Sequence, residues 1–461
     1  MSARTRVGAV ALSLVLATGS LAGCARGAGS STDAPEFSPD TPVEGSLSIM
    51  GFGTGDEIGE VRYDRALAAL GDVDVTLAEG ELDIQAFLSA VASGNPPDLV
   101  YASRDQIGSF ASRGAVVPLD QCVESESIDT EAFDDAALGQ VTFDGSLYGV
   151  PEFNTVQLVM ASSDLLSAAG LSIEDVDGSD WSAMAAANQA LTQQDGGRLS
   201  VIGVDPKLPE FLPLWAHANG TDLLSADGRT AQLDDPAVVE ALEAAVALYD
   251  AQGGFSDVKS FRDSADFFGA ENQYATGELG AMPMEQWYVN VLNESSPDAP
   301  LAFTTVKGTD GEPLAYASGS AWAVPSGAEN PQAACAFARL MTETDAWVEA
   351  AQARADARAE SGTLFTGLLT GNTEADQRIR DELVPTDAPA PWGDAIAATY
   401  EANDHTFSLP ANPADNAFKT AWQDAVNRVL NGQQEPAAAL AQAQEEAQAV
   451  LDDAWATWDE R

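Results

Sequence analysis

The chain has 461 residues, of which 72 are acidic and 21 are basic, giving a formal net charge of −51. A surface this acidic repels nucleic acid and anionic headgroups, so we expect neither to be a partner. Salt screens the repulsion between like charges, and we therefore predict a salt-tolerant or salt-requiring protein. The alternative is an acidic secreted protein with no salt requirement.

The first residues have the pattern of an exported lipoprotein. Two arginines precede an apolar run over 7–20, and the sequence Leu-Ala-Gly-Cys follows, ending at Cys24. The run is shorter than the roughly 20 apolar residues of a spanning helix. The tetrapeptide resembles the bacterial lipobox, in which the cysteine is lipidated. We expect a signal peptide over 1–23, a flexible linker over 24–44, and a lipid on Cys24 that holds the protein at the outer face of the cytoplasmic membrane.

Strand and helix patterns alternate once the folded part begins. Predicted strands cover 46–52, 73–77 and 98–101, and predicted helices cover 57–70 and 84–91. This order requires crossover connections, which favours a largely parallel sheet.

A second unit of the same kind follows. It begins with a strand over 156–160 and contains a helix over 236–249 that Pro236 opens. A final helix starts at Pro436 and carries an apolar stripe to Trp458. We predict an α/β fold in two units.

Residues with catalytic potential are scarce. His217 and His405 are the two histidines, and no hydrolase, zinc-protease or phosphate-loop motif occurs. We expect no enzyme activity, cofactor or metal. A glycosidase needs only two carboxyl groups, so it remains the enzymatic alternative. Cys122 and Cys335 form either a disulfide or two separate buried thiols, and we favour the thiols.

Several phrases, in this order, resemble bacterial extracellular solute-binding protein family 1, the sugar-binding lipoproteins of ABC importers that are similar to the maltose-binding protein. They lie at 94–100, 114–120, 144–151, 165–171 ahead of 180–181, 277–282 with Trp287, 318–325 and 330–334. Their order and spacing, together with the lipobox, carry the resemblance.

The resemblance implies two lobes joined by three crossing segments, with the ligand between them. We expect 45–150 plus 305–324 in one lobe and 151–304 plus 325–461 in the other. By analogy the crossings lie near 150–155, 303–307 and 324–328. Ligand binding then closes the hinge, and the membrane permease recognises the closed form.

The residues expected to line the cleft are aromatic, acidic or amide side chains near strand ends and crossings. A sugar offers apolar ring faces and a rim of hydroxyls, which such side chains can stack on and hydrogen-bond. The candidates are Trp287, Trp392, Trp322, Asp105, Glu152, Asn154, Glu285, Phe52, Asp56 and Glu57. Core packing is the alternative for the aromatic ones.

The predicted function is that of an extracellular receptor that binds a mono- or oligosaccharide and delivers it, unaltered, to ABC permease subunits. We expect it to act as a monomer. The alternative ligands are a polyamine, a phosphodiester or a peptide.

Overall fold

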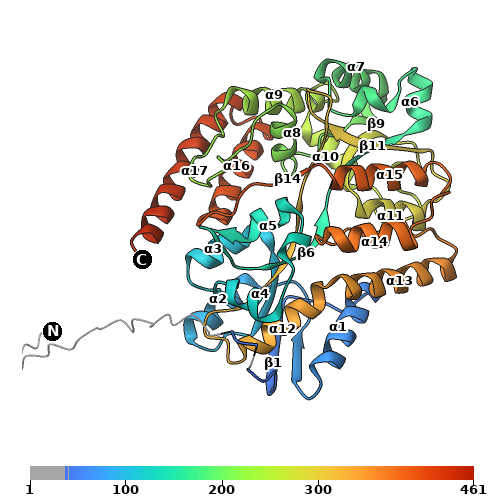
Figure 1. Cartoon of the computed structure of the whole chain (residues 1–461). Coiled ribbons are helices and arrows are strands. Elements are labelled where there is room, and N and C mark those ends of the chain that lie inside the picture. Colours follow the sequence, from blue (N-terminus) through green and yellow to red (C-terminus); the bar gives the residue numbers. More distant parts are fainter. Residues whose placement is uncertain (1–36, 40) are drawn as a thin grey trace, which may run out of the picture. The chain divides into compact units, whose positions relative to one another are not determined.

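A computed structural model describes residues 37–39 and 41–461 (Figure 1). The predicted signal peptide, Cys24 and most of the predicted linker lie outside these residues. Pro35–Arg461 forms one compact unit. Within the described part, no helix combines the length and apolar character needed to cross a bilayer.

The first lobe is built on a five-stranded sheet with the order β2-β1-β3-β13-β6. The strands are β1 (Ser46–Met50), β2 (Asp74–Ala78), β3 (Leu99–Ser103), β6 (Val150–Thr155) and β13 (Ser318–Ala323). β1 is parallel to β2 and β3, whereas β13 is antiparallel to both β3 and β6. The predicted alternation of strands and helices is confirmed here.

The helices of the first lobe start and stop where the sequence provides caps. They are α1 (Glu57–Leu70), α2 (Ile84–Ser93), α3 (Ile107–Ser112), α4 (Asp120–Glu126), α5 (Asp135–Val141) and α12 (Pro331–Thr342), with short 3-10 turns η1 (Arg104–Gln106) and η2 (Thr130–Ala132). Asp56 caps α1 by accepting a hydrogen bond from the Gly59 amide at 2.8 Å. Gly94 ends α2 with a φ of 75°, a left-handed conformation that glycine adopts without a steric penalty.

A disulfide joins two helices in the core of this lobe. Cys122 of α4 and Cys335 of α12 are fully buried, and their Cα atoms are 5.8 Å apart. Our preference for two separate thiols was therefore wrong. The pair is separated by 213 residues in the sequence, and spacing alone does not reveal that α12 packs beside α4.

The second lobe is built on a seven-stranded sheet with the order β14-β12-β11-β7-β10-β9-β8. The strands are β7 (Gln157–Ser162), β8 (Gln193–Asp195), β9 (Arg198–Val204), β10 (Leu279–Glu285), β11 (Leu301–Lys307), β12 (Pro313–Tyr316) and β14 (Thr406–Phe407). Only β9 with β10 and β12 with β14 are parallel neighbours among the described strands of this sheet. A separate hairpin pairs β4 (Thr142–Phe143) with β5 (Ser146–Leu147).

Helices cover the second sheet and extend across to the first lobe (Figure 1). Those of the second lobe are α6 (Ser163–Ala169), η3 (Ile173–Val176), α7 (Trp181–Leu191), α8 (Leu212–Ala218), α9 (Pro236–Asp250), α10 (Phe255–Asp263), α11 (Trp287–Ser295) and α15 (Trp392–Asn403). The remaining helices are α13 (Thr344–Ser361), α14 (Thr373–Leu383), α16 (Asp415–Leu430) and α17 (Pro436–Asp459). α13 packs on both α1 and α14, and α16 contacts α3 and η1 as well as α17.

The α/β two-lobed fold is confirmed, but the predicted segment boundaries differ from the sheet membership. The end of β11 and all of β12 belong to the second sheet, although 305–324 was expected in the first lobe. Residues 331–342 form α12 and pack in the first-lobe core, although 325–461 was expected in the second. The chain passes between the sheets at Val156, at Ala317, and through α13 with the segment after it. Apolar alternation predicts a strand, but it does not say which sheet the strand joins.

Candidate ligand-binding cleft

The carboxyl ends of strands from both lobes lie beside the crossings. Ser103, the last residue of β3, is paired with Ser320, which lies just after the crossing at Ala317. Glu285, the last residue of β10, is paired with Gln157, which lies just after the crossing at Val156. Parallel strands bind ligands at their carboxyl ends, where the strand order reverses, as it does between β1 and β3. The two lobes therefore present their ligand-binding edges to the same gap.

A cavity of about 160 Å³ opens at this meeting point. Its wall combines the start of α1, the end of β6, the start of α11, α13, and the segment that follows α13. The lining residues are Asp56, Ile58, Phe153, Asn154, Thr155, Gln286, Trp287, Asn290, Arg354, Thr366, Gly367, Leu368, Leu369 and Thr399. Both lobes and the crossing segments contribute, which is the arrangement expected of an interlobe site.

Trp287 is the aromatic residue of this cavity that comes from the second lobe. It is the first residue of α11 and is half-buried. Its indole Nε1 donates to the carboxylate of Glu285 at 3.1 Å. Burial raises the pKa of Glu285, while the Trp287 hydrogen bond and the nearby charge of Lys207 oppose that rise. The site thus holds a flat apolar ring whose edge is fixed by an acidic group.

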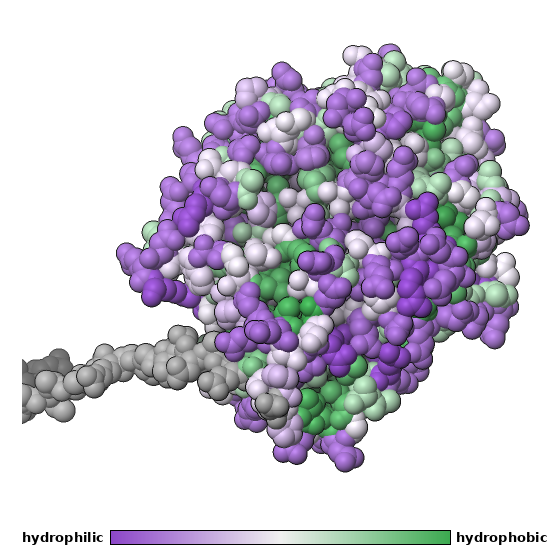
Figure 2. Space-filling view, viewed as in Figure 1, coloured by the Kyte–Doolittle hydropathy of each residue, from purple (hydrophilic) through white to green (hydrophobic). Residues whose placement is uncertain are grey.

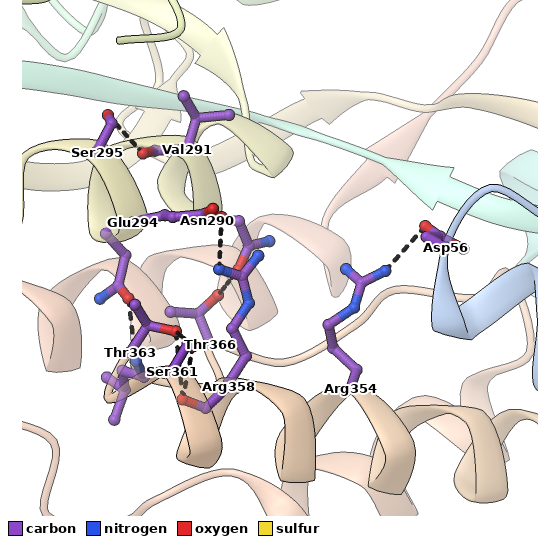
Figure 3. Close-up of polar contacts among 12 residues, drawn as sticks. Asp56, Asn290, Val291, Glu294, Ser295, Arg354, Arg358, Ser361, Thr363 and Thr366 are labelled. Carbon is purple, nitrogen blue, oxygen red and sulfur yellow. Dashed lines mark hydrogen bonds and ion pairs between the residues drawn. The ribbon is translucent and has the colours of Figure 1, made fainter. Parts of the chain in front are cut away.

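Two arginines on one face of α13 connect this helix to both lobes (Figure 3). Arg354 donates to Asp56 at 2.8 Å and also forms an ion pair with Glu57, both at the start of α1. Four residues later, Arg358 pairs with Glu294 of α11 at 2.9 Å. These contacts tie the third crossing to the first lobe at one end and to the second lobe at the other.

Asn290 and Thr366 complete the second-lobe wall of the cavity. The Thr366 hydroxyl donates to the Asn290 side-chain oxygen at 2.8 Å, as Figure 3 shows. This bond leaves the Asn290 amide nitrogen available to donate into the cavity. The cavity wall therefore carries amide, guanidinium and carboxylate groups around Trp287.

A buried polar chain runs through the crossings behind the cavity. The Arg104 guanidinium donates to the Asn154 side-chain oxygen at 2.8 Å. The Asn154 amide nitrogen donates to Asn403 at 2.8 Å, and Asn403 donates in turn to the Asp376 carboxylate at 3.2 Å. Two amides therefore lie head to tail between a buried cation and a buried acid, all four being less than a tenth exposed.

The same guanidinium contacts the first crossing directly and reaches the second through Gln140. Arg104 donates to the Phe153 carbonyl at 2.9 Å and to the Gln140 side-chain oxygen at 3.0 Å. Gln140 donates onward to the carbonyl of Ala317 at 3.1 Å. Burial lowers the pKa of Arg104 to about 10 and raises that of Asp376 to about 7. Arg104 therefore connects several first-lobe residues beside the crossings through its hydrogen bonds.

Five of the predicted site residues lie at or beside the cavity. Trp287, Asp56 and Asn154 line it, Glu285 holds Trp287, and Glu57 pairs with the lining residue Arg354. Asp105 lies elsewhere. It pairs with Lys419 at 2.7 Å and borders a separate small cavity of about 40 Å³ with residues of α16.

Three predicted site residues lie instead in the first-lobe core. Phe52 packs against Trp322, whose Nε1 donates to Glu152, and Glu152 pairs with Arg62 at 2.8 Å. Phe52 is 4% exposed, and Trp322 and Glu152 are fully buried. Glu152 is held by the buried Arg62, and Trp322 packs between Phe52 and Phe337, so proximity to a crossing did not make these side chains accessible.

Two further candidates, Trp392 and Asn154, are largely buried. Trp392 is 6% exposed and packs near Phe303 of β11, because it begins α15 on the inner face of that helix. Asn154 borders the cavity, but its side chain is used on both sides by Arg104 and Asn403. Both side chains are almost fully buried in this conformation.

The sequence analysis missed Arg354, Asn290 and Thr366. Arg354 had a recognisable signal, since Arg354 and Arg358 stand four residues apart in a chain with few basic residues. Asn290 and Thr366 had none, because they approach each other only when α11 packs beside the third crossing.

Residues 63–359, well over half of the chain, match the sequence pattern of a family described as bacterial extracellular solute-binding proteins. The chain belongs to this family. The solute-binding protein is 25% identical over 263 residues to the maltooligosaccharide ABC transporter solute-binding lipoprotein of Streptococcus pneumoniae, covering 55% of this chain and 57% of that one. It is 28% identical over 108 residues to the maltodextrin-binding protein MdxE of Bacillus subtilis, covering 23% and 24%. The matches span about a quarter to just over half of these relatives' lengths.

Solved structures share the two-lobed fold of this solute-binding protein. The substrate-binding protein Lmo0181 of Listeria monocytogenes, in complex with cycloalternan, matches with a TM-score of 0.70 and 19% identity, covering 89% of this chain and 99% of that one. CpMnBP1 with mannotriose bound matches with a TM-score of 0.68 and 22% identity, covering 88% and 100%.

Proposed function

We propose that this protein is the substrate-binding component of an ABC importer and that it binds a carbohydrate between its lobes. The observation that carries the proposal is the half-buried Trp287 at the point where the strand ends of both lobes meet the crossings. A pyranose has apolar ring faces and a hydroxyl rim, so an aromatic face beside carboxylate, amide and guanidinium groups suits it. Asp56, Asn290 and Arg354 supply those groups.

Binding closes the hinge and breaks no bond in the ligand. Contacts to both lobes favour the closed form, because a ligand shifts an equilibrium only by its differential affinity for the two states. The permease then recognises the closed receptor. The relatives named for maltodextrin and maltooligosaccharide support a sugar as the solute.

We also infer that the protein is exported and anchored through Cys24. The basic start, the short apolar run and the lipobox-like sequence ending at Cys24 support this inference. Labelling cells with a radioactive fatty acid should mark the wild-type protein and leave the Cys24→Ala variant unlabelled. Equal labelling of both would rule out this anchor.

Titration calorimetry with a panel of mono- and oligosaccharides tests the function. We expect at least one sugar to bind. No reducing ends should be released during incubation. Trp287→Ala should then weaken binding by about 1–3 kcal/mol, because the ring face is lost. Unchanged affinity in this variant, or consumption of the sugar, would refute the proposal.

Trp458→Ala is a matched control for that experiment. Its Nε1 also donates to a carboxylate, that of Asp144 at 2.8 Å, and it also packs against a phenylalanine, Phe143. It belongs to α17 and does not line the cavity. The control variant should keep wild-type affinity.

A further inference from the structure

Four aromatic residues form two stacked pairs beside the cleft. The consecutive residues Phe267 and Phe268 precede β10, and the consecutive residues Trp287 and Tyr288 begin α11. Phe267 stacks on Tyr288 with ring centres 4.2 Å apart and planes 13° apart. Phe268 lies parallel to Trp287, with centres 6.2 Å apart and planes 16° apart. Each ring of the Phe267-Phe268 pair therefore faces one ring of the Trp287-Tyr288 pair.

The inner pair fixes this segment in place. Tyr288 is 1% exposed, and its hydroxyl donates to the Phe267 carbonyl at 2.8 Å. Burial of the ring raises the pKa of Tyr288, so the hydroxyl remains protonated as a donor. Because Phe267 is held at both its ring and its carbonyl, the position of Phe268 next to Trp287 is set by the fold.

The outer pair remains open to solvent. Phe268 is 68% exposed, and across residues 37–39 and 41–461 the other exposed large apolar side chain is Val450, at 36%. Hydrophilic residues cover most of the visible face of the molecule (Figure 2). Because the exposed Phe268 ring lies nearly parallel to Trp287, which lines the binding cavity, it extends the aromatic surface of that cavity towards solvent.

We propose that Phe268 is a second stacking residue of the cleft and that it selects ligands with at least two linked sugar rings. The inference rests on the proposed function. A first ring stacks on Trp287, whose edge Glu285 holds, and the next ring of the chain lies over Phe268. The two ring planes are nearly parallel and their centres are 6.2 Å apart, so that together they offer more aromatic surface than a single sugar ring covers.

The test compares Phe268→Ala with wild type, using the monosaccharide, disaccharide and trisaccharide of whichever sugar binds. Affinity for the two longer ligands should fall about tenfold, because one aromatic contact of this kind changes affinity by about that factor. Affinity for the monosaccharide should stay within about twofold. Phe268→Trp should restore the preference for longer ligands, and Phe268→Leu should not, because leucine keeps apolar area without a flat face.

Val450→Ala is the matched control, since it removes the other exposed apolar side chain, on α17. Its affinities should equal those of wild type. Equal loss for all three sugars in Phe268→Ala would mean that the residue only supports Trp287, and this would overturn the inference. So would a wild-type protein that binds the monosaccharide as tightly as the longer ligands. If Trp287→Ala abolishes binding while Phe268→Ala leaves it unchanged, the proposed function stands and this inference alone fails.

Discussion

Asp376 should make the stability of the protein depend on pH. Its carboxylate is 5% exposed and accepts hydrogen bonds from Thr370 and Asn403. Burial is the largest cause that raises its pKa, from 3.8 to about 7, and the nearby charge of Asp134 adds to the rise. Between these two values the folded protein keeps the proton that the unfolded chain releases. The unfolded state then binds fewer protons, so stability falls as the pH rises.

The magnitude follows from the size of that shift. Each pKa unit corresponds to about 1.4 kcal/mol, so ionising Asp376 in the folded state costs about 4 kcal/mol in full. Part of this cost is already present at pH 5, because the unfolded carboxyl is ionised there. We therefore expect Asp376 to lower the free energy of unfolding by roughly 2–3 kcal/mol between pH 5 and pH 8.

Urea unfolding of wild type and Asp376→Asn at both pH values isolates this contribution. A fixed high salt concentration should be used to screen the surface charges that both proteins share. Between pH 5 and pH 8, the free energy of unfolding of the variant should fall by roughly 2–3 kcal/mol less than that of wild type. Asp381→Asn, on the exposed side of the same helix, should follow wild type. Parallel profiles for wild type and Asp376→Asn would refute the reasoning.

Two further expectations concern the whole molecule. The melting temperature should rise from low salt to about 1 M NaCl, because a net charge of −51 repels itself; a melting temperature that does not rise would contradict this. Replacing both Cys122 and Cys335 by alanine should lower the free energy of unfolding by roughly 2–5 kcal/mol, and reducing the wild-type disulfide should reproduce much of that loss. A double variant as stable as wild type would count against a stabilising disulfide.

The first lobe was predictable from local signals. Short apolar runs predicted β1 and β3, and helical spacing predicted α1 over 57–70, because both features are set within a few residues of the chain. Sheet membership was not predictable in the same way. β11 joins the second sheet through pairing with β7, more than a hundred residues earlier in the chain, and its own sequence is equally suited to either sheet.

The candidate site divides along similar lines. Trp287 was predicted from the family resemblance and Asp56 from its place at the exit of the first strand, and both line the cavity. Glu152 is buried in an ion pair with Arg62 of α1, which no local pattern encodes. Phe268 gave no signal either. It is notable only through its exposure and its alignment with Trp287, both of which are tertiary facts.

The buried polar chain also constrains how the lobes can close. Separating Asn154 from Asn403 would leave buried partners unsatisfied, at about 1–3 kcal/mol for each group. A micromolar ligand supplies only about 8 kcal/mol of binding energy in total. Points on a rotation axis move least, so closure that keeps the contacts of Arg104, Asn154 and Asn403 must turn about an axis close to them. A sugar-bound crystal structure should therefore keep the 2.8 Å contact between Asn154 and Asn403 while Asp56 and Trp287 approach each other. A closed form in which that contact is broken would place the axis elsewhere.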